Sequence, residues 1–176
     1  MNRRVWLLAL GQTLTYAGIF YAFPALLPNL IAGTGWSVAQ LALGPTLGFL
    51  VMAALISQSG RLLDRGYGPM MMVLGPLLAA LCLLGLGVAG QVWQWHLLWL
   101  GIGIAQAGCL YETCFALLTR SLADSGQLTA RAAITRVTLV AGLASTLAFP
   151  LGNVLGRTLG GQGALIAFAG LVASAS

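Results

Sequence analysis

The stretch SGRLLDRGYGP, residues 59–69, contains three of the charged side chains in a chain that has only eight basic and three acidic residues. Residues 5–60 carry no Asp, Glu, Lys or Arg, and neither do residues 66–111. A membrane-spanning helix needs roughly 20 apolar residues, so each uncharged run is long enough for two spans. The charged stretch therefore lies between two pairs of predicted membrane helices.

Composition excludes a water-soluble globular protein. Apolar residues make up 59% of the chain and charged residues only 6%, which is too few charges to cover a surface that faces water. Residues 137–156 offer one further span, and the chain is again apolar from residue 164 to its end. We therefore expect an all-α polytopic membrane bundle of six transmembrane helices, the sixth cut short. The expected helices cover residues 5–31, 38–58, 70–90, 97–119, 134–156 and 163–176.

The basic residues do not indicate nucleic-acid binding. All of them are arginines, and they are spread over predicted helix ends instead of forming one basic stripe. The three cysteines lie inside predicted spans without C-x-x-C spacing, so we expect no metal site and no cofactor. The lipid bilayer is the partner that the composition itself implies.

The arginines predict the orientation of the chain, because short loops rich in Lys and Arg face the cytoplasm. Arg3 and Arg4 precede the first helix, two arginines lie between the second and third, and three lie between the fourth and fifth, whereas the opposite loops carry only Arg157. We expect a cytoplasmic N-terminus, with residues 59–69 as a short cytoplasmic loop. Tryptophans of an aromatic belt cluster at the other interface: Trp36, Trp93, Trp95 and Trp99.

Local signals predict where the second and third helices begin and end. Ser37 with Gln40 three residues later is a capping-box pattern that starts the second helix. Gly60 suits the left-handed position just past its end, and Pro69 suits the first turn of the third helix. These assignments predict a tight turn between the two helices.

The same loop resembles a signature of the major facilitator superfamily of secondary transporters. Gly60, Leu62, Asp64 and Arg65 fit the pattern G-x-L-x-D-R-x-G-R-R between helices 2 and 3 of that family. The resemblance implies a conformational latch in which Gly60 permits the turn and Asp64 and Arg65 make and break contacts as the protein rocks. The sequence departs from the pattern at its end, where the expected glycine and basic pair are replaced by Tyr67, Pro69 and Met70.

The resemblance also implies an architecture. Residues 1–176 would be the N-terminal half of a twelve-helix transporter, truncated in helix 6, built as 3+3 inverted repeats and completed by a missing C-terminal six-helix half. A short echo between GRLL at Gly60 and GRTL at Gly156 is consistent with such a repeat. The string YETCFALLTR, residues 111–120, is similar to bacterial members related to monocarboxylate carriers.

Glu112 is the ionisable residue placed well inside a predicted span, about 12 Å from Arg120 along a helix. An acid in the membrane is costly unless it faces a cavity, a partner or its own proton. With Gly101, Ala105 and Gly108 it follows helical spacing on a small-residue stripe that is expected to face inward. We expect Glu112 to couple transport to protons, or else to fix helix packing. Arg120 could pair with Asp64 or Asp124.

Other polar residues inside the predicted spans are candidates for the substrate cavity. Helices 1 and 4 line the central cavity in this superfamily, and each such residue could instead form a hydrogen bond between helices. The candidates are Gln12, Tyr16, Gln106, Tyr111 and Asn153.

These expectations combine into one function, a secondary transporter that moves a small-molecule substrate by alternating access, driven by a proton gradient. The alternative is a non-transporting six-helix membrane subunit or scaffold. An enzyme is not expected, because His96 lies in an outer loop and no G-x-S-x-G string occurs. The expected location is the bacterial cytoplasmic membrane.

Overall fold

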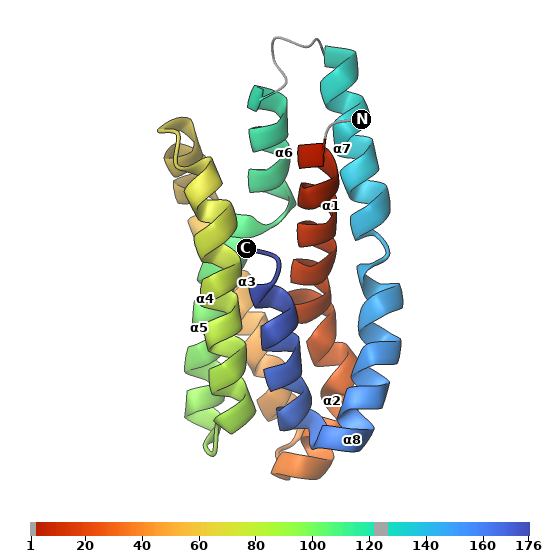
Figure 1. The fold of residues 1–176 in the computed structure, drawn as a ribbon. Coiled ribbons are helices and arrows are strands. Elements are labelled where there is room, and N and C mark those ends of the chain that lie inside the picture. Colours follow the sequence, from red (N-terminus) through yellow and green to blue (C-terminus); the bar gives the residue numbers. More distant parts are fainter. Residues whose placement is uncertain (1–2, 122–126) are drawn as a thin grey trace.

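The computed structural model describes residues 3–121 and 127–176, and every element in these residues is helical (Figure 1). The elements are α1 (Arg3–Tyr16), the π-helical turn η1 (Ala17–Tyr21), α2 (Ala22–Thr34), α3 (Val38–Asp64), α4 (Gly68–Val88), α5 (Val92–Cys109), α6 (Tyr111–Ser121), α7 (Gln127–Ala141) and α8 (Ala144–Ala173).

Five helical stretches in the described residues are long and apolar enough to cross a membrane: Val5–Thr34, Val38–Asp64, Gly68–Val88, Val92–Arg120 and Thr129–Ala173. The prediction of an all-α chain with long apolar helices is confirmed at this level. The first stretch joins α1, η1 and α2 into one span, and the fourth joins α5 to α6. We call these stretches spans one to five.

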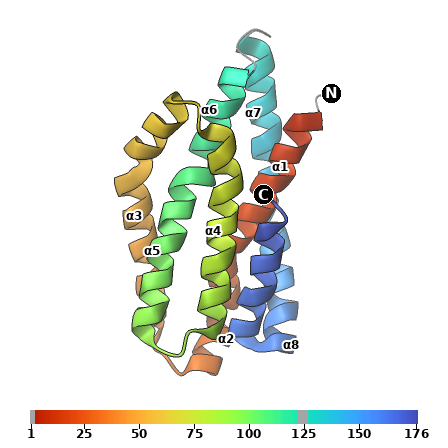
Figure 2. The same ribbon diagram turned by 60° about the vertical axis from the view of Figure 1, so that its left-hand side comes forward.

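The fifth span reverses direction at Gly160, whose backbone is non-helical (φ 74°, ψ 172°). A residue with positive φ favours glycine because glycine has no Cβ to clash. Residues 161–173 then run back along the bundle beside α4 (Figures 1 and 2). The helix predicted at 163–176 therefore begins at residue 161 and ends at residue 173, and it is shorter than a full span.

Several predicted boundaries are wrong. The helix predicted at 97–119 begins at Val92 and is interrupted at Leu110, whose extended backbone (φ −83°, ψ −167°) separates α5 from α6. The helix predicted at 134–156 begins earlier, at Gln127, and is interrupted by a turn between Ala141 and Ala144. Apolar composition alone does not reveal such interruptions, because the residues on both sides remain apolar.

The turn between α3 and α4 differs from its prediction. Helix α3 continues through Gly60 to Asp64, and the left-handed residue is Gly66 (φ 90°). The N–H of Gly66 donates to the Leu63 carbonyl, and the N–H of Tyr67 donates to the Leu62 carbonyl, which is the Schellman arrangement. Gly60 is therefore an interior helical residue and does not form the turn.

Two predicted helix starts are confirmed. The Ser37 hydroxyl accepts the N–H of Gln40, and the Gln40 side chain accepts the N–H of Ser37, so the capping box begins α3. Pro69 lies in the first turn of α4. Both predictions rest on residues within one helical turn, so they do not depend on how the helices pack.

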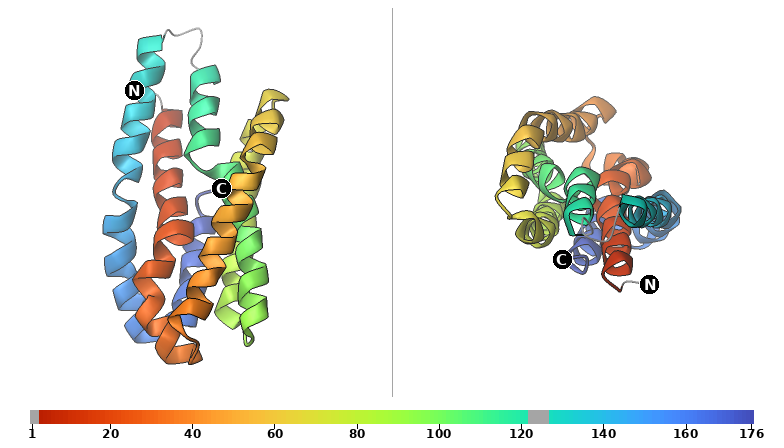
Figure 3. Two further views of the ribbon diagram at one scale, coloured as in Figure 1. Left: turned by 180° about the vertical axis from the view of Figure 1, so that it is seen from behind. Right: turned by 90° about the horizontal axis from the view of Figure 1, so that it is seen from above.

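The spans pack in an interleaved order, which means that most of the close contacts join spans that are not consecutive in the sequence. Helix α3 packs on α5, α4 packs on both α5 and α8, and the first span packs on α7 and α8 (Figures 2 and 3). Seen along the bundle axis, α6 lies between the α3–α5 group and the first and fifth spans (Figure 3). At the α3–α5 crossing a Cβ on Gly103 would overlap the Gly48 carbonyl, so small residues allow backbone contact there.

The two ends of the bundle differ in chemistry. The arginine end carries Arg61, Arg65 and Arg120, and the tryptophan end carries Trp36 and Trp95. Trp95 and Trp99, expected in an aromatic belt, are instead buried in the core, where Trp95 Nε1 donates to the Leu41 carbonyl at 3.0 Å. Their burial means that they hold α5 against α3 instead of facing lipid.

Candidate functional site

The arginine end is closed by an ion pair between α3 and α6. Arg120 contacts the carboxylate of Asp64, and its guanidinium also donates to the Leu63 carbonyl at 2.6 Å. A cation on the last carbonyls of a helix is favourable, because these groups carry the negative end of the helix dipole. The predicted pairing of Arg120 with Asp64 is therefore observed, whereas Asp124 lies outside the described residues.

Arg65, predicted as the latch partner of Asp64, follows it directly at the C-cap of α3 and is exposed. Within the described ranges the ion pair of Asp64 is made with Arg120. The residue that pairs with Asp64 and joins two helices is thus Arg120 on α6. The family motif covers only the loop after α3, so it does not include this residue.

Two buried glutamines link the first span to the fourth. Gln12 and Gln106 are each 1% exposed. Gln12 Nε2 donates to the Cys109 carbonyl at 2.8 Å, and Gln106 Nε2 donates to the Ile19 carbonyl at 3.2 Å. We call these two hydrogen bonds the glutamine bridges. Both residues therefore take the helix-to-helix role that was the alternative to substrate contact.

Each bridge ends where the receiving helix is irregular. Cys109 is the last residue of α5, directly before the extended Leu110, and Ile19 lies in the π-helical turn η1. Breaks and π turns disturb the regular helical ladder, and in lipid the freed backbone groups need another partner. Each glutamine supplies that partner to the other span.

Seven aromatic side chains form a connected chain of ring contacts across four spans. Ring centroids lie 5.0 Å apart for Tyr111 and Phe115, and 4.4 Å apart for Tyr16 and Tyr111. The chain continues from Tyr16 through neighbouring rings of η1 to α3 and α8, with centroid distances of 5.1 to 6.5 Å. We call this set the aromatic band; its members are Tyr16, Phe20, Tyr21, Phe49, Tyr111, Phe115 and Phe149.

The aromatic band lies on an accessible face. Phe20 and Phe49 are each 37% exposed and Phe149 is 48% exposed. Phe20 lies near the middle of the span Val5–Thr34, and Phe49 near the middle of Val38–Asp64. The band therefore crosses the bundle near half its height, and it includes two of the predicted cavity residues, Tyr16 and Tyr111.

Glu112 lies beside this band, in the first turn of α6. It follows Tyr111, a member of the band, directly in the sequence, and it is exposed. The predicted inward stripe with Gly101, Ala105 and Gly108 is interrupted, because the break at Leu110 changes the helical register before Glu112. Its side chain is thus turned to the accessible surface and not into the core.

Asn153 lies away from the glutamine bridges. It is exposed and lines a groove of about 750 Å³ between α2 and α8, together with Asn29, Phe149 and Arg157. Phe149 belongs both to this groove and to the aromatic band. The groove therefore extends from the band toward the tryptophan end.

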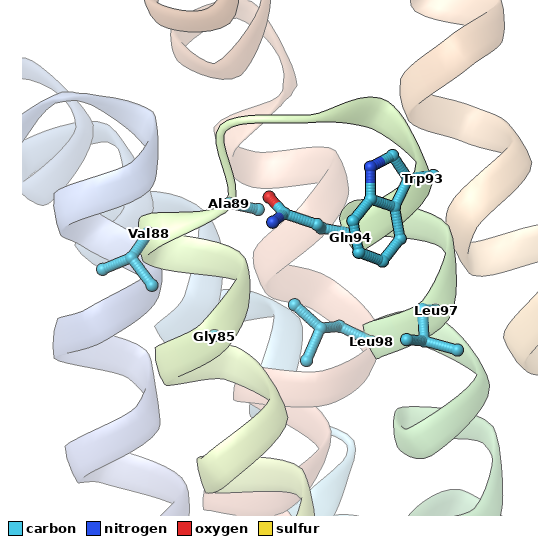
Figure 4. Close-up of a pocket in the computed structure, with 7 residues that line it drawn as sticks. All are labelled: Gly85, Val88, Ala89, Trp93, Gln94, Leu97 and Leu98. Carbon is cyan, nitrogen blue, oxygen red and sulfur yellow. The ribbon is translucent and has the colours of Figure 1, made fainter.

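A second cavity lies at the tryptophan end between α4 and α5 (Figure 4). Its lining includes Val88, Trp93, Leu97 and Leu98, which are apolar. Its polar residue, Gln94, already accepts the N–H groups of Gly90 and Gln91 through Oε1. These side chains therefore shape the loop, and they offer little chemistry to a ligand.

No protein-family model, curated protein or solved structure matches the chain. The described residues contain no group of three or more His, Cys, Asp or Glu side chains that could hold a metal ion. The resemblance to the major facilitator superfamily therefore stays a prediction.

The phenylalanines of the aromatic band were not among the site residues predicted from the sequence. Phe20, Phe49 and Phe149 lie on three different spans, and apolar rings are expected in any membrane helix. The sequence signal closest to them is the pair Tyr16 and Tyr111, which were predicted as cavity residues and belong to the same band. Their neighbours in space become known only when the spans are packed.

Proposed function

We propose that the chain is one half of a proton-coupled secondary transporter of the major facilitator type, which moves a small solute by alternating access. The observation that carries this proposal is the accessible aromatic band with Glu112 beside it, near the middle of four spans. A carboxyl on a membrane-exposed surface is costly, so we infer that this face lines a substrate cavity. Transporters of this architecture bind substrate near the midplane, between two halves.

The packing supports an arrangement of two inverted repeats of three helices. In such an arrangement span one corresponds to span four, the second to the fifth, and the third to residues 161–173. The glutamine bridges fit this correspondence, because each of the two related spans donates to the other. Gln12 of the first span donates to the Cys109 carbonyl of the fourth, and Gln106 of the fourth span donates to the Ile19 carbonyl of the first. The contact of α3 with α5 likewise has a counterpart in the contact of the first span with α7 and α8.

Alternating access needs contacts that can open at one end. The ion pair of Asp64 with Arg120 suits that role, because both side chains are about half or more exposed and joined across two helices. Exposed ion pairs contribute about 1 kcal/mol or less, so this one can break at little cost. Arg65 would then be a second cation with which Asp64 could pair when α3 and α6 move apart.

The proposed location is the bacterial cytoplasmic membrane, with the N-terminus and the arginine end in the cytoplasm. A second six-helix half, encoded after Ser176 or on another polypeptide, would cover the aromatic band and complete the cavity. Charge distribution and span lengths support this assignment.

The test is proton flux through the assembled transporter in proteoliposomes that contain a pH-sensitive dye. A panel of small cationic, anionic and neutral solutes is added on one side, with and without an imposed pH gradient. We expect at least one solute to move protons, and Glu112→Gln to abolish that movement. Trp93→Leu, at an exposed site remote from the band, is the matched control and should leave it unchanged.

Proton flux that is equal in wild type and Glu112→Gln would remove the coupling role of this residue. An absence of flux for every class of solute, with correctly folded protein, would instead favour the non-transporting membrane subunit. That second function would use the exposed band as a docking face for another membrane protein.

A further inference from the structure

We propose that the groove between α2 and α8 binds an anionic amphiphile, a molecule in which a carboxylate or phosphate group is joined to an apolar body. The anionic group binds at Arg157, Asn153 and Asn29, and the apolar body lies against Phe149. The inference goes beyond the proposed function, because it involves neither Glu112 nor the movement of protons.

The wall formed by α8 changes from apolar to cationic along the groove. Phe149, Asn153 and Arg157 line the groove at intervals of four residues, so they lie on one face of the helix, about 6 Å apart along its axis. Phe149 belongs to the aromatic band, and Arg157 lies three residues before the reversal at Gly160. A ligand that lies along this wall meets an aromatic ring, then an amide, then a guanidinium.

The wall formed by α2 has the same gradient and is fixed against α8 (Figure 1). Ala25 and Asn29 line the groove one helical turn apart, and the amide is nearer to the tryptophan end. A Cβ on Gly152 would lie 2.9 Å from the Cβ of Ala25. A Cβ on Gly156 would likewise lie 2.6 Å from Oδ1 of Asn29. The Asn29 amide is therefore held against the α8 backbone, at the residue before Arg157.

The polar side chains of the groove are available to a ligand. Within the part of the chain that the structure describes, the side chains of Arg157, Asn153 and Asn29 make no hydrogen bond, and Arg157 makes no ion pair. A guanidinium has five N–H donors and an amide has two. The buried amides of Gln12 and Gln106 are different, because their donors are used in the glutamine bridges.

Charge selects an anion for this groove. Its lining carries one positive charge, on Arg157, and no negative charge. Of the two acids in the described residues, Asp64 is paired with Arg120 at the arginine end, and Glu112 lies on α6. A guanidinium can bind a carboxylate or a phosphate through two parallel hydrogen bonds. A cationic ligand would be repelled, and a neutral one would leave this charge unpaired.

The size and lining of the groove favour an organic anion over a small inorganic one. Its volume of about 750 Å³ lies within the range of about 300–1,000 Å³ that is usual for small-molecule sites. Pro24, Pro28 and Pro150 contribute apolar rings to the lining, in addition to Phe149. Burial of apolar surface against these rings stabilises a ligand with an apolar body.

Binding of naphthalene-2-carboxylate, a soluble anion with an apolar body, tests the inference. The chain is placed in nanodiscs of phosphatidylcholine, and the dissociation constant is measured by calorimetry, with protein-free nanodiscs as the reference for partition into lipid. Naphthalene-2-carboxamide is the neutral ligand of the same shape, and 2-naphthylmethylammonium is the cationic one. We expect the carboxylate to bind about tenfold more tightly than either.

Variants assign the binding to the groove. Arg157→Gln should weaken carboxylate binding about tenfold, to the level of the carboxamide, whereas Arg157→Lys should weaken it less because the charge remains. Asn153→Leu should weaken it about two- to fivefold, through loss of one hydrogen bond. Phe149→Leu should weaken carboxylate and carboxamide binding alike, since the ring contacts the apolar body. Arg136→Gln, which removes the same charge from an exposed position on α7, is the matched control and should change neither.

Native mass spectrometry distinguishes two sources of the anion, a lipid headgroup and a soluble molecule. The chain is released from nanodiscs that contain phosphatidylglycerol and phosphatidylcholine, and the retained lipids are counted. Retention of phosphatidylglycerol that is lost in Arg157→Gln but kept in Arg136→Gln would identify a lipid headgroup. Equal retention in all three proteins, with carboxylate binding that depends on Arg157, would identify a soluble organic anion.

The inference is overturned if Arg157→Gln changes neither carboxylate affinity nor phosphatidylglycerol retention more than Arg136→Gln does, because the net charge of the chain would then explain any binding. Circular dichroism checks that the variants keep their helix content. Binding is measured without a solute gradient, so this failure would leave the transporter proposal unchanged. That proposal is tested separately by proton flux in wild type and Glu112→Gln.

Discussion

Gly60 and Gly66 lie six residues apart at the arginine end and have different roles. Gly60 is helical, and a Cβ there would meet no heavy atom within 4 Å. Gly66 has a φ of 90° at the C-terminal cap of α3. The family pattern points to Gly60, whereas the backbone requires a glycine at Gly66.

Gly66→Ala should destabilise the chain and Gly60→Ala should not. Alanine in the left-handed region costs about 1–2 kcal/mol, whereas alanine replacing an exposed helical glycine gains about 0.5–1 kcal/mol. Unfolding by sodium dodecyl sulfate in mixed micelles, followed by circular dichroism, measures both changes. Equal destabilisation by the two variants would show that Gly60 has a role beyond its helical conformation.

Residue-scale chemistry explains which parts of the site were predictable. The capping box of Ser37 was predicted, because it depends on residue types three positions apart. For Asp64 the family motif named Arg65 as the partner, and Arg120, the observed partner, was expected to pair with either Asp64 or Asp124. The position of Glu112 was not predicted, since the expected inward stripe assumed an unbroken helix and Leu110 interrupts it. Gln12 and Gln106 were correctly identified as polar residues inside spans, but their partners are carbonyls whose exposure depends on irregular backbone.

At the scale of elements, the first and fourth spans are irregular at points where they meet. The π-helical turn η1 and the break at Leu110 each leave a carbonyl that the other span satisfies through the glutamine bridges. Each distortion is therefore stabilised by the neighbouring span and not by its own sequence. This explains why neither one could be predicted from the apolar pattern.

The glutamine bridges predict a coupled effect on stability. Gln12→Leu and Gln106→Leu should each destabilise the chain by about 0.6 to 1.7 kcal/mol, the usual range for a hydrogen bond between membrane helices. The double variant should cost less than the sum, because both bonds hold one crossing. Unfolding in mixed micelles measures the cycle, with exposed Gln58→Leu as the control that stays within about 0.5 kcal/mol. Strict additivity would show that the two bridges act independently.

At the scale of the whole molecule, composition predicted an all-α bundle with long apolar helices, and the described residues confirm it. The reversal at Gly160 agrees with the prediction from the sequence, since it lies between the helices expected at 134–156 and 163–176. Composition could not predict the interleaved packing, since the contacts of α3 with α5 and of α4 with α8 join segments far apart in sequence.

The two ends of the bundle predict opposite labelling in cells. Cys82, Cys109 and Cys114 are buried, so the wild-type chain should react little with a membrane-impermeant maleimide. Tyr67→Cys and Trp93→Cys introduce single exposed thiols at the arginine end and the tryptophan end. We expect Trp93→Cys to be labelled in intact cells and Tyr67→Cys only after lysis. Labelling of both from outside would contradict the proposed orientation.

The interleaved packing also determines the order in which the protein can assemble during synthesis. The first three spans pack little on one another, because their main partners are α5, α7 and α8. As the chain emerges from the ribosome, these spans lie in the bilayer as nearly independent helices until their partner helices are inserted. Until the fourth span arrives, the carbonyl of Ile19 has no Gln106 to bind. The protein therefore depends most on lipid or on an insertion chaperone while only its first three spans have been synthesised.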